Sequence, residues 1–195
     1  MNQLAQLNDR VREFLTTLDA HNPGEAAHAH RVSVYAVATA DRLGVREDDL
    51  IHLKWAALLH DVGKVSVDAR LMQKLGKLDE IELAALREHA SAAESVIEGT
   101  LWLVPAAPMI RHHHEWWNGE GYPDGLSGEA IPLGARIIGL AEAYDVLVSD
   151  VPWRNRLDET LALEELERCS GKQFDPVVLD AFRKIQPLVQ PADPA

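Results

Sequence analysis

The chain has 195 residues, which is enough for one ordinary domain with a short arm at either end. Hydrophobic residues make up 47% of it and charged residues 26%, a balance typical of globular proteins that excludes a disordered or collagen-like chain. The formal net charge of −12 repels polyanions, so duplex nucleic acid is not expected as a partner.

The sequence shows no signal for a membrane or for secretion. Its apolar stretches are far shorter than the roughly 20 residues of a membrane span. Residues 1–12 lack the apolar segment of a secretory signal. The lone cysteine, Cys169, cannot form an internal disulfide, which suits a reducing compartment. We therefore expect a cytoplasmic protein that does not bind a membrane.

Helical periodicity runs through the whole chain. Apolar residues at helical spacing, with glycine and proline at the breaks, predict helices over residues 3–19, 24–43, 47–61, 68–74, 79–98, 106–114, 132–149, 158–171 and 175–186. Asp79 followed by Glu82 has the form of a capping box. Four glycines and Pro123 predict a loop over 115–131. No segment alternates like a strand, so the fold is expected to be all-α.

Histidines are the candidates for site chemistry. His60 and Asp61 lie at the expected end of a helix. Within a helix, neighbouring side chains point about 100° apart and rarely bind one metal together, but at a helix end they can. The run 112–114 consists of three histidines, which could be ligands or could complement a helix dipole. His28 and His89 lie on two other helices, and each alone could be an ordinary core or surface residue.

Several helices of a bundle can project such side chains into one interior. Imidazole together with carboxylate suits iron, manganese, zinc or nickel. Two such ions about 3.5–4 Å apart can activate water and neutralise a phosphodiester. They would also provide positive charge where an acidic protein has to bind an anionic group.

Three segments carry the most specific signal. They are His60-Asp61-Val62-Gly63-Lys64, His113-His114-Glu115 and Asn118-Gly119-Glu120-Gly121-Tyr122-Pro123. With supporting matches at 28–32, 131–138 and 171–176, they resemble the HD-GYP domain of the HD phosphohydrolase superfamily. The resemblance extends over about residues 22–185 in the order of the family.

The resemblance implies a fold and an activity. The fold is an all-α, single-domain, multi-helix bundle of the HD type, with a metal site in its interior and a Gly-rich GYP loop. The chain would divide into an N-terminal helix or linker at 1–21, an HD-GYP domain at 22–188 and a disordered tail at 189–195. The first segment could also support a homodimer. The activity is hydrolysis of cyclic di-GMP to linear pGpG or GMP through a metal-activated water.

The resemblance also implies roles for individual residues. The metal ligands would be His28, His60, Asp61, His89, His113, His114 and, in place of the usual aspartate, Glu142. Asp61 would bridge two divalent metals, with iron or manganese favoured over zinc or nickel, and orient the attacking hydroxide. Lys64 would contact the scissile phosphate beside Asp61. Further substrate contacts would come from Gly121, Tyr122, Pro123, Trp153 and Arg154, although the first three could simply form a stable turn.

Three departures from the family pattern bear on these roles. Glu142 is one methylene longer than the usual aspartate but can still bind a borderline metal. Val151 replaces an arginine that would anchor the substrate. Gly24 stands where three-metal members carry glutamate, with Glu25 one residue out of register, which predicts two metals rather than three.

Two alternatives to a cyclic di-GMP phosphodiesterase follow from these departures. One is a degenerate module that keeps its metal and binds a protein partner through the GYP loop, with Trp116, Trp117 and Tyr122 as anchors. The other is a phosphohydrolase for another cyclic dinucleotide or nucleotide. The remaining histidines match no ligand position and are expected at the surface: His21, His30, His52 and His112.

Overall fold

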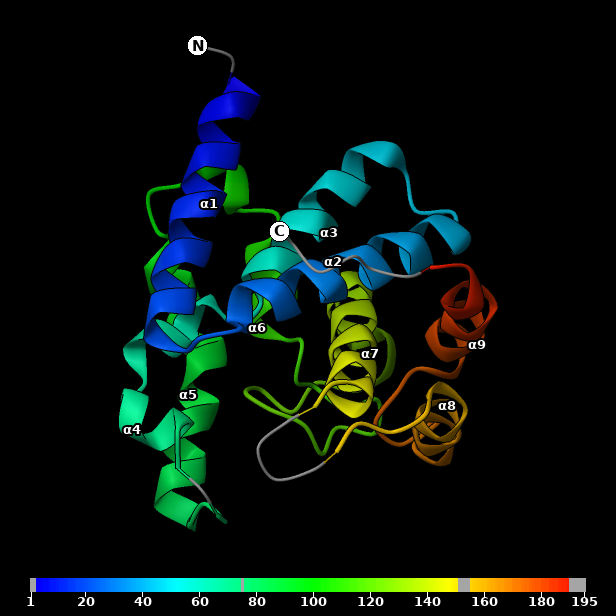
Figure 1. Ribbon diagram of the computed structural model, residues 1–195. Helices are drawn as coiled ribbons and strands as arrows, with labels where there is room; N and C mark the ends of the chain where they lie inside the picture. The colour runs from blue at the N-terminus through cyan, green and yellow to red at the C-terminus, as the bar shows by residue number, and fades with distance from the viewer. Residues whose placement is uncertain (1–2, 75, 151–154, 190–195) are drawn as a thin grey trace.

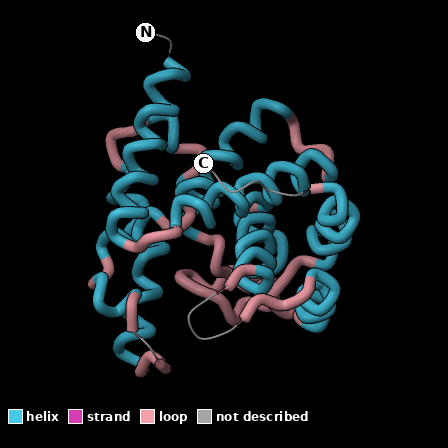
Figure 2. Tube along the Cα trace, in the orientation of Figure 1, coloured by secondary structure: helices cyan, strands magenta, loops and turns pink. Residues whose placement is uncertain are grey.

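The computed structural model describes residues 3–74, 76–150 and 155–189, and these residues form helices and loops without a β-strand (Figures 1 and 2). The α-helices in this part are α1 (Gln3–His21), α2 (Glu25–Arg42), α3 (Glu47–Leu59), α4 (Ala69–Met72), α5 (Glu80–Ile97), α6 (Ala107–Arg111), α7 (Leu133–Val148), α8 (Glu159–Arg168) and α9 (Pro176–Ile185). Short 3-10 segments are η1 (Val62–Ser66), η2 (Leu101–Leu103), η3 (Gly128–Ala130) and η4 (Gln186–Leu188). The all-α expectation is confirmed.

Most helices begin where the sequence predicts. The Asp79 side chain accepts hydrogen bonds from the backbone N–H groups of Ile81 and Glu82, and the Glu82 carboxylate accepts one from the backbone of Asp79. This capping box satisfies N–H groups that would otherwise lack a partner at the start of α5. Asp158 caps α8 in the same way, through the backbone N–H of Thr160.

Helices α3, α4, α6 and α8 end earlier than expected, at Leu59, Met72, Arg111 and Arg168. At α3 and α6 a histidine ring binds a carbonyl at the end of the helix. The Nδ1 atom of His60 donates to the carbonyl of Ala57, and that of His113 donates to the carbonyl of Ile110. Each ring binds a carbonyl that a longer helix would offer to its own backbone. As a result α3 ends at Leu59, and the run 112–114 follows α6 rather than forming its last turn.

The core surrounds α2, which packs against α3, α7 and α9 (Figure 1). At its centre the rings of Tyr35, Tyr144 and Phe182 pack on one another, with centroids 5.0–5.7 Å apart. Gln186 donates to the Tyr144 hydroxyl over 2.7 Å, which ties the C-terminal helices to α7. The apolar stripe of α1, which includes Val11 and Leu15, is buried in the same core.

None of the helices in the described ranges combines the length and apolarity that crossing a bilayer requires. The end of α3, together with α2, α5, α7 and the turn after α6, brings most of the chain's histidines to one place. That meeting point is the candidate functional site.

Candidate metal centre

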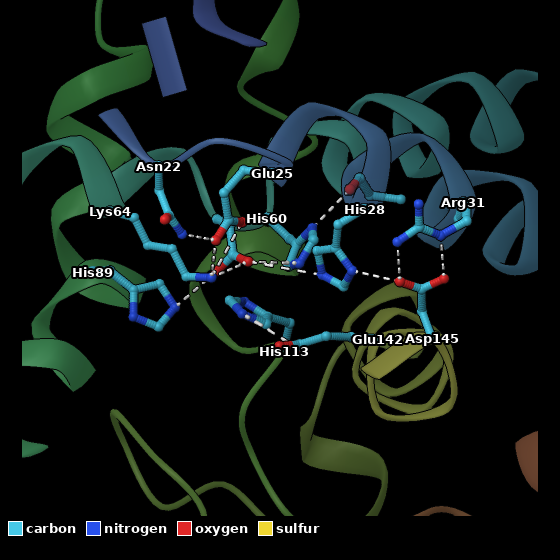
Figure 3. A network of polar contacts seen from close by, with 12 residues as sticks. Asn22, Glu25, His28, Arg31, His60, Lys64, His89, His113, Glu142 and Asp145 are labelled. Atoms are coloured by element: carbon cyan, nitrogen blue, oxygen red, sulfur yellow. Dashed lines mark hydrogen bonds and ion pairs between the residues drawn. The ribbon is translucent and has the colours of Figure 1, made fainter. Parts of the chain in front are cut away.

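Five segments deliver one compact set of side chains (Figure 3). Their potential ligand atoms form two groups, and within each group all the atoms lie within 4.8 Å of one another. The groups are Asp61, His89, His113 and His114, and His28, His60, Asp61 and Glu142. Asp61 belongs to both groups. These seven residues, called the metal cluster below, are the same seven that the sequence predicted as ligands.

Backbone carbonyls hold three of the imidazoles in place. His60, His89 and His113 each donate from Nδ1 to the carbonyl three residues earlier, over 2.8, 2.6 and 2.6 Å. The Nε2 atoms of the three rings therefore point inward, and all are buried without a hydrogen-bond partner in the described part of the chain. Metal-bound histidines commonly show this pattern, with one ring nitrogen bound to a carbonyl and the other free for the ion.

The buried ligand atoms without hydrogen-bond partners show whether this site suits a metal ion. Asp61 Oδ1 is also buried without a hydrogen-bond partner among the described residues. Buried polar atoms without partners cost about 1–3 kcal/mol each unless something else binds them. Imidazole nitrogens with carboxylate oxygens are a suitable donor set for a divalent transition metal. The residues present therefore fit the metal that the sequence implied.

Asp61 is surrounded by cations and rings. Lys64 Nζ lies 2.6 Å from its Oδ2, His60 Nε2 lies 3.1 Å from Oδ2 and His89 Nε2 lies 3.3 Å from Oδ1. Burial alone would raise the pKa of Asp61, but Lys64, His60 and His89 together hold that pKa well below its usual range. Asp61 is therefore a carboxylate at neutral pH, the form that binds metal.

The histidines differ in their protonation. Burial tends to lower the pKa of His60, but the Asp61 carboxylate outweighs it and raises this pKa to about 9. Burial lowers the pKa of His113 well below its usual value and lowers the pKa of His114 to about 4. The rings of His113 and His114 are therefore neutral and able to bind an ion, whereas His60 holds a proton that an ion must displace.

A carboxylate that the sequence reasoning left without a role approaches Lys64. Glu25, the first residue of α2, lies 3.1 and 3.3 Å from Lys64 Nζ through its two oxygens. Asn22 donates to Glu25 Oε1 over 2.6 Å. Lys64 is thus held between Glu25 and Asp61, and Figure 3 shows Lys64 beside Glu25. The signal was available, because Glu25 precedes His28 by three residues and shares its helix face.

A second overlooked residue, Asp145, orients His28. Its Oδ2 accepts from His28 Nδ1 over 2.7 Å and from Arg31 over 2.9 Å, and its Oδ1 accepts from Arg31 over 2.7 Å. These bonds leave His28 Nε2 facing Asp61 at 4.0 Å. Figure 3 shows His28 between His60 and Asp145. Asp145 follows Glu142 by three residues and therefore shares its face of α7, which could have identified it.

The GYP loop closes one side of the metal cluster. The Tyr122 ring stacks on His114 with centroids 4.7 Å apart, and the Arg87 guanidinium lies 5.0 Å from the Tyr122 ring. A Cβ at Gly121 would lie 2.2 Å from the backbone nitrogen of Trp116, so a side chain there would push the loop away. The peptide bond between Tyr122 and Pro123 is cis. The close packing of the loop is therefore enough to require glycine at position 121, whether or not Gly121 contacts a substrate.

Two hollows flank the metal cluster. A cavity of about 240 Å³ lies beside His114 and Glu142 and is also lined by Arg136 and Trp117. A hollow of about 540 Å³ begins at Glu25 and Lys64 and is largely apolar. The site therefore has room on two sides for groups attached to a bound phosphate.

Some predictions need correction, and others cannot be compared with the structure. Val151, Trp153 and Arg154 lie outside the described residues. Of the four histidines expected at the surface, His30 is exposed, but the other three are partly buried. His21 hydrogen-bonds the carbonyl of Val67, His52 packs on Trp55, and His112 lies against the GYP loop.

Comparison with known proteins identifies the family. The model of the HD domain family matches residues 14–178. The chain therefore belongs to the HD domain family, and the HD-GYP resemblance of its motifs is confirmed.

The curated relatives are longer proteins. A cyclic di-GMP phosphodiesterase response regulator of Xanthomonas campestris is 35% identical over 91% of this chain and 48% of its own length. A 3′3′-cGAMP-specific phosphodiesterase of Vibrio cholerae is 37% identical over 92% of this chain and 39% of its own length. The chain thus spans half or less of the length of these relatives.

Solved structures share the fold. A cyclic GMP-AMP-specific phosphodiesterase of V. cholerae superposes with a TM-score of 0.67 at 21% identity, covering 91% of this chain and 48% of that one. An HD-GYP-type protein of Bdellovibrio bacteriovorus also gives a TM-score of 0.67, at 22% identity, covering 91% of this chain and 60% of that one. Identities this low establish the common fold alone.

Proposed function

We propose that this chain is a metal-dependent phosphodiesterase that hydrolyses a cyclic dinucleotide, with cyclic di-GMP as the first candidate and linear pGpG or GMP as the product. The observation that carries the proposal is the pair of ligand groups sharing Asp61. Two ions held by a common carboxylate form the arrangement that suits hydrolysis of a phosphodiester. Curated relatives named as cyclic di-GMP and cGAMP phosphodiesterases support the same substrate class.

In this proposal the seven residues of the metal cluster hold two divalent ions, with iron or manganese favoured. When bound, the ions supply Lewis acidity toward the phosphate and lower the pKa of water. Side chains of the protein would bind and orient the phosphate. Lys64, whose ammonium lies 2.6 Å from Asp61, is placed to donate to a phosphate oxygen beside the cluster. Burial tends to lower the pKa of Lys64, but Asp61 and Glu25 outweigh it and raise that pKa, so the side chain keeps its charge.

The shape around the cluster agrees with a substrate that carries two nucleosides. The hollows beside Glu142 and beside Lys64 lie on different sides of the ligands. Tyr122, stacked on His114, closes the cluster between α5 and the GYP loop. A phosphodiester bound at Asp61 could extend one nucleoside into each hollow. The complete ligand set also favours hydrolysis over a module that only binds a protein partner.

Turnover by the metal-loaded protein tests the proposal. The chain is loaded with Mn²⁺ or, without oxygen, Fe²⁺, and chromatography follows the hydrolysis of cyclic di-GMP, 3′3′-cGAMP and cyclic di-AMP. Asp61→Asn should lose turnover together with the metal of the cluster, because one carboxylate serves both of its ligand groups. His30→Ala is the matched control, since His30 is exposed on α2 and outside the cluster.

The outcomes separate the alternatives. Fastest turnover of cyclic di-GMP supports the full proposal, whereas preference for another dinucleotide keeps the reaction and changes the substrate. A metal-loaded protein that hydrolyses none of the three would overturn the proposal in favour of the partner-binding module.

A further inference from the structure

A second set of potential ligands lies outside the metal cluster. His112, Glu115 and Asp124 each offer a ligand atom, and the three atoms lie within 4.8 Å of one another. His112 follows the last residue of α6, and Glu115 follows His113 and His114. Asp124 belongs to the GYP loop, directly after Pro123. The three are called the outer triad below.

The distances within the outer triad suit a shared ion. His112 Nδ1 lies 3.6 Å from Glu115 Oε1 and 3.7 Å from Asp124 Oδ2. Both separations are too long for hydrogen bonds. Two ligands bound about 2.1 Å from one ion, at angles of about 110–120°, lie about 3.4–3.6 Å apart. These two separations, together with the 4.8 Å limit on all three pairs, match the coordination of one cation.

The burial of Glu115 is an independent observation. Its side chain is 0% exposed. Its Oε1 accepts a hydrogen bond from the backbone nitrogen of Asp124 over 2.7 Å, which aims the carboxylate at the loop and at His112. Its Oε2 and the Nδ1 of His112 are both buried without a hydrogen-bond partner in the described part of the chain. A buried carboxylate in this state is costly unless a cation binds it.

The charged side chains beside the outer triad carry more negative than positive charge. Arg111 makes two hydrogen bonds to Asp124, over 2.9 and 2.8 Å, and lies 3.8 Å from Glu94. The Arg111 guanidinium thus interacts electrostatically with three carboxylates, those of Glu94, Glu115 and Asp124. A divalent cation at the outer triad would balance the remaining negative charge.

We propose that the outer triad binds one divalent transition cation, for which Zn²⁺ is the probe. One imidazole and two carboxylates make a suitable donor set for such an ion, with a water molecule completing the coordination. The ion would tie the GYP loop to the end of α6. Because Tyr122 lies two residues before Asp124, the ion would also hold the Tyr122 ring over His114.

Metal content of single variants tests this site. The chain is stripped with chelator, reloaded with Zn²⁺, dialysed and analysed for zinc per chain. His112→Gln and Asp124→Asn should each hold about one ion fewer than the unaltered chain, because each removes a ligand of the same ion. Glu94→Gln is the matched control, since it removes a carboxylate beside Arg111 but no member of the outer triad.

Two comparisons keep the test decisive. The one-ion difference should persist when Asp61→Asn is added, so a failure of the proposed hydrolysis would leave this site standing. Equal zinc content in all the variants, or an equal loss in Glu94→Gln, would overturn the outer-triad site. Circular dichroism confirms that each variant is folded before its zinc is counted.

Discussion

Among the histidines of the metal cluster, His60 differs in charge from its neighbours His113 and His114. Burial works against a proton on His60, but Asp61 raises its pKa to about 9, so the metal-free protein carries that proton at neutral pH. Burial lowers the pKa values of the other two rings. A metal ion entering the cluster must therefore displace a proton from one particular ring.

This difference predicts how metal binding depends on pH. Below pH 9 the folded, metal-free protein has His60 protonated, so affinity should weaken as the pH falls, by up to about tenfold per unit. Calorimetry at pH 7.5 in buffers of different ionisation enthalpy should detect about one more proton released per chain than at pH 10. Identical proton release at the two pH values would contradict the assignment of His60.

The replacement at Glu142 leads to a second prediction. Glu142 Oε2 lies 3.8 Å from His114 Nδ1 and 4.0 Å from His113 Nε2, so the longer side chain reaches the cluster. Glu142→Ala should lower metal content by about one ion, whereas Glu142→Asp should retain it. Elemental analysis measures both, with Glu129→Ala as the control on an exposed carboxylate. Unchanged metal in Glu142→Ala would remove Glu142 from the ligand set.

At the scale of elements, the contact between η1 and α5 sets the distance from Asp61 to His89. A Cβ on Gly63 would lie 1.9 Å from the carbonyl oxygen of His89 and 2.9 Å from the backbone nitrogen of Ala93. Both are backbone atoms, so the two elements would have to separate. Gly63 is therefore required by a close approach of two backbones beside the metal cluster.

We expect Gly63→Ala to destabilise the fold by about 1–3 kcal/mol and to weaken metal binding, because it moves His89 away from Asp61. Urea unfolding and metal titration measure the two effects. Gly134→Ala is the control, since its Cβ would meet the flexible side chain of Met109 rather than backbone. Wild-type metal affinity in Gly63→Ala would show that the cluster tolerates a wider gap.

Part of the fold and of the metal cluster was predictable from the sequence. Periodicity and caps located most of the helices, and the resemblance to the HD-GYP family pointed to all seven residues that the structure brings together around Asp61. The roles of Glu25 and Asp145 were missed: local spacing places them on the helix faces of His28 and Glu142, but their contacts with Lys64 and His28 join segments far apart in sequence. The ends of α3 and α6 were missed because histidine rings bind the carbonyls there, a choice that periodicity does not encode.

At the scale of the whole molecule, the metal cluster joins segments spread from His28 to Glu142. An ion that binds only the folded chain stabilises it by about 4 kcal/mol at a thousand times its Kd. For a domain of this size, that corresponds to a rise in Tm of roughly 8–16 °C. Thermal unfolding with and without Mn²⁺ should show this rise in the unaltered chain and a clearly smaller one in Asp61→Asn, which keeps only the outer triad. An equal rise in both would mean that the ion binds elsewhere.

The packing of Tyr144 against Phe182 has a consequence for fragment design. A fragment that stops at residue 150 would retain every member of the metal cluster. It would lose Phe182, which is fully buried against Tyr35 and Tyr144, and removing a core phenylalanine costs about 3–5 kcal/mol. The helix that carries Glu142 would then lack its support. The smallest workable expression unit is therefore set by α9, which contributes no ligand, and not by the last residue of the motif.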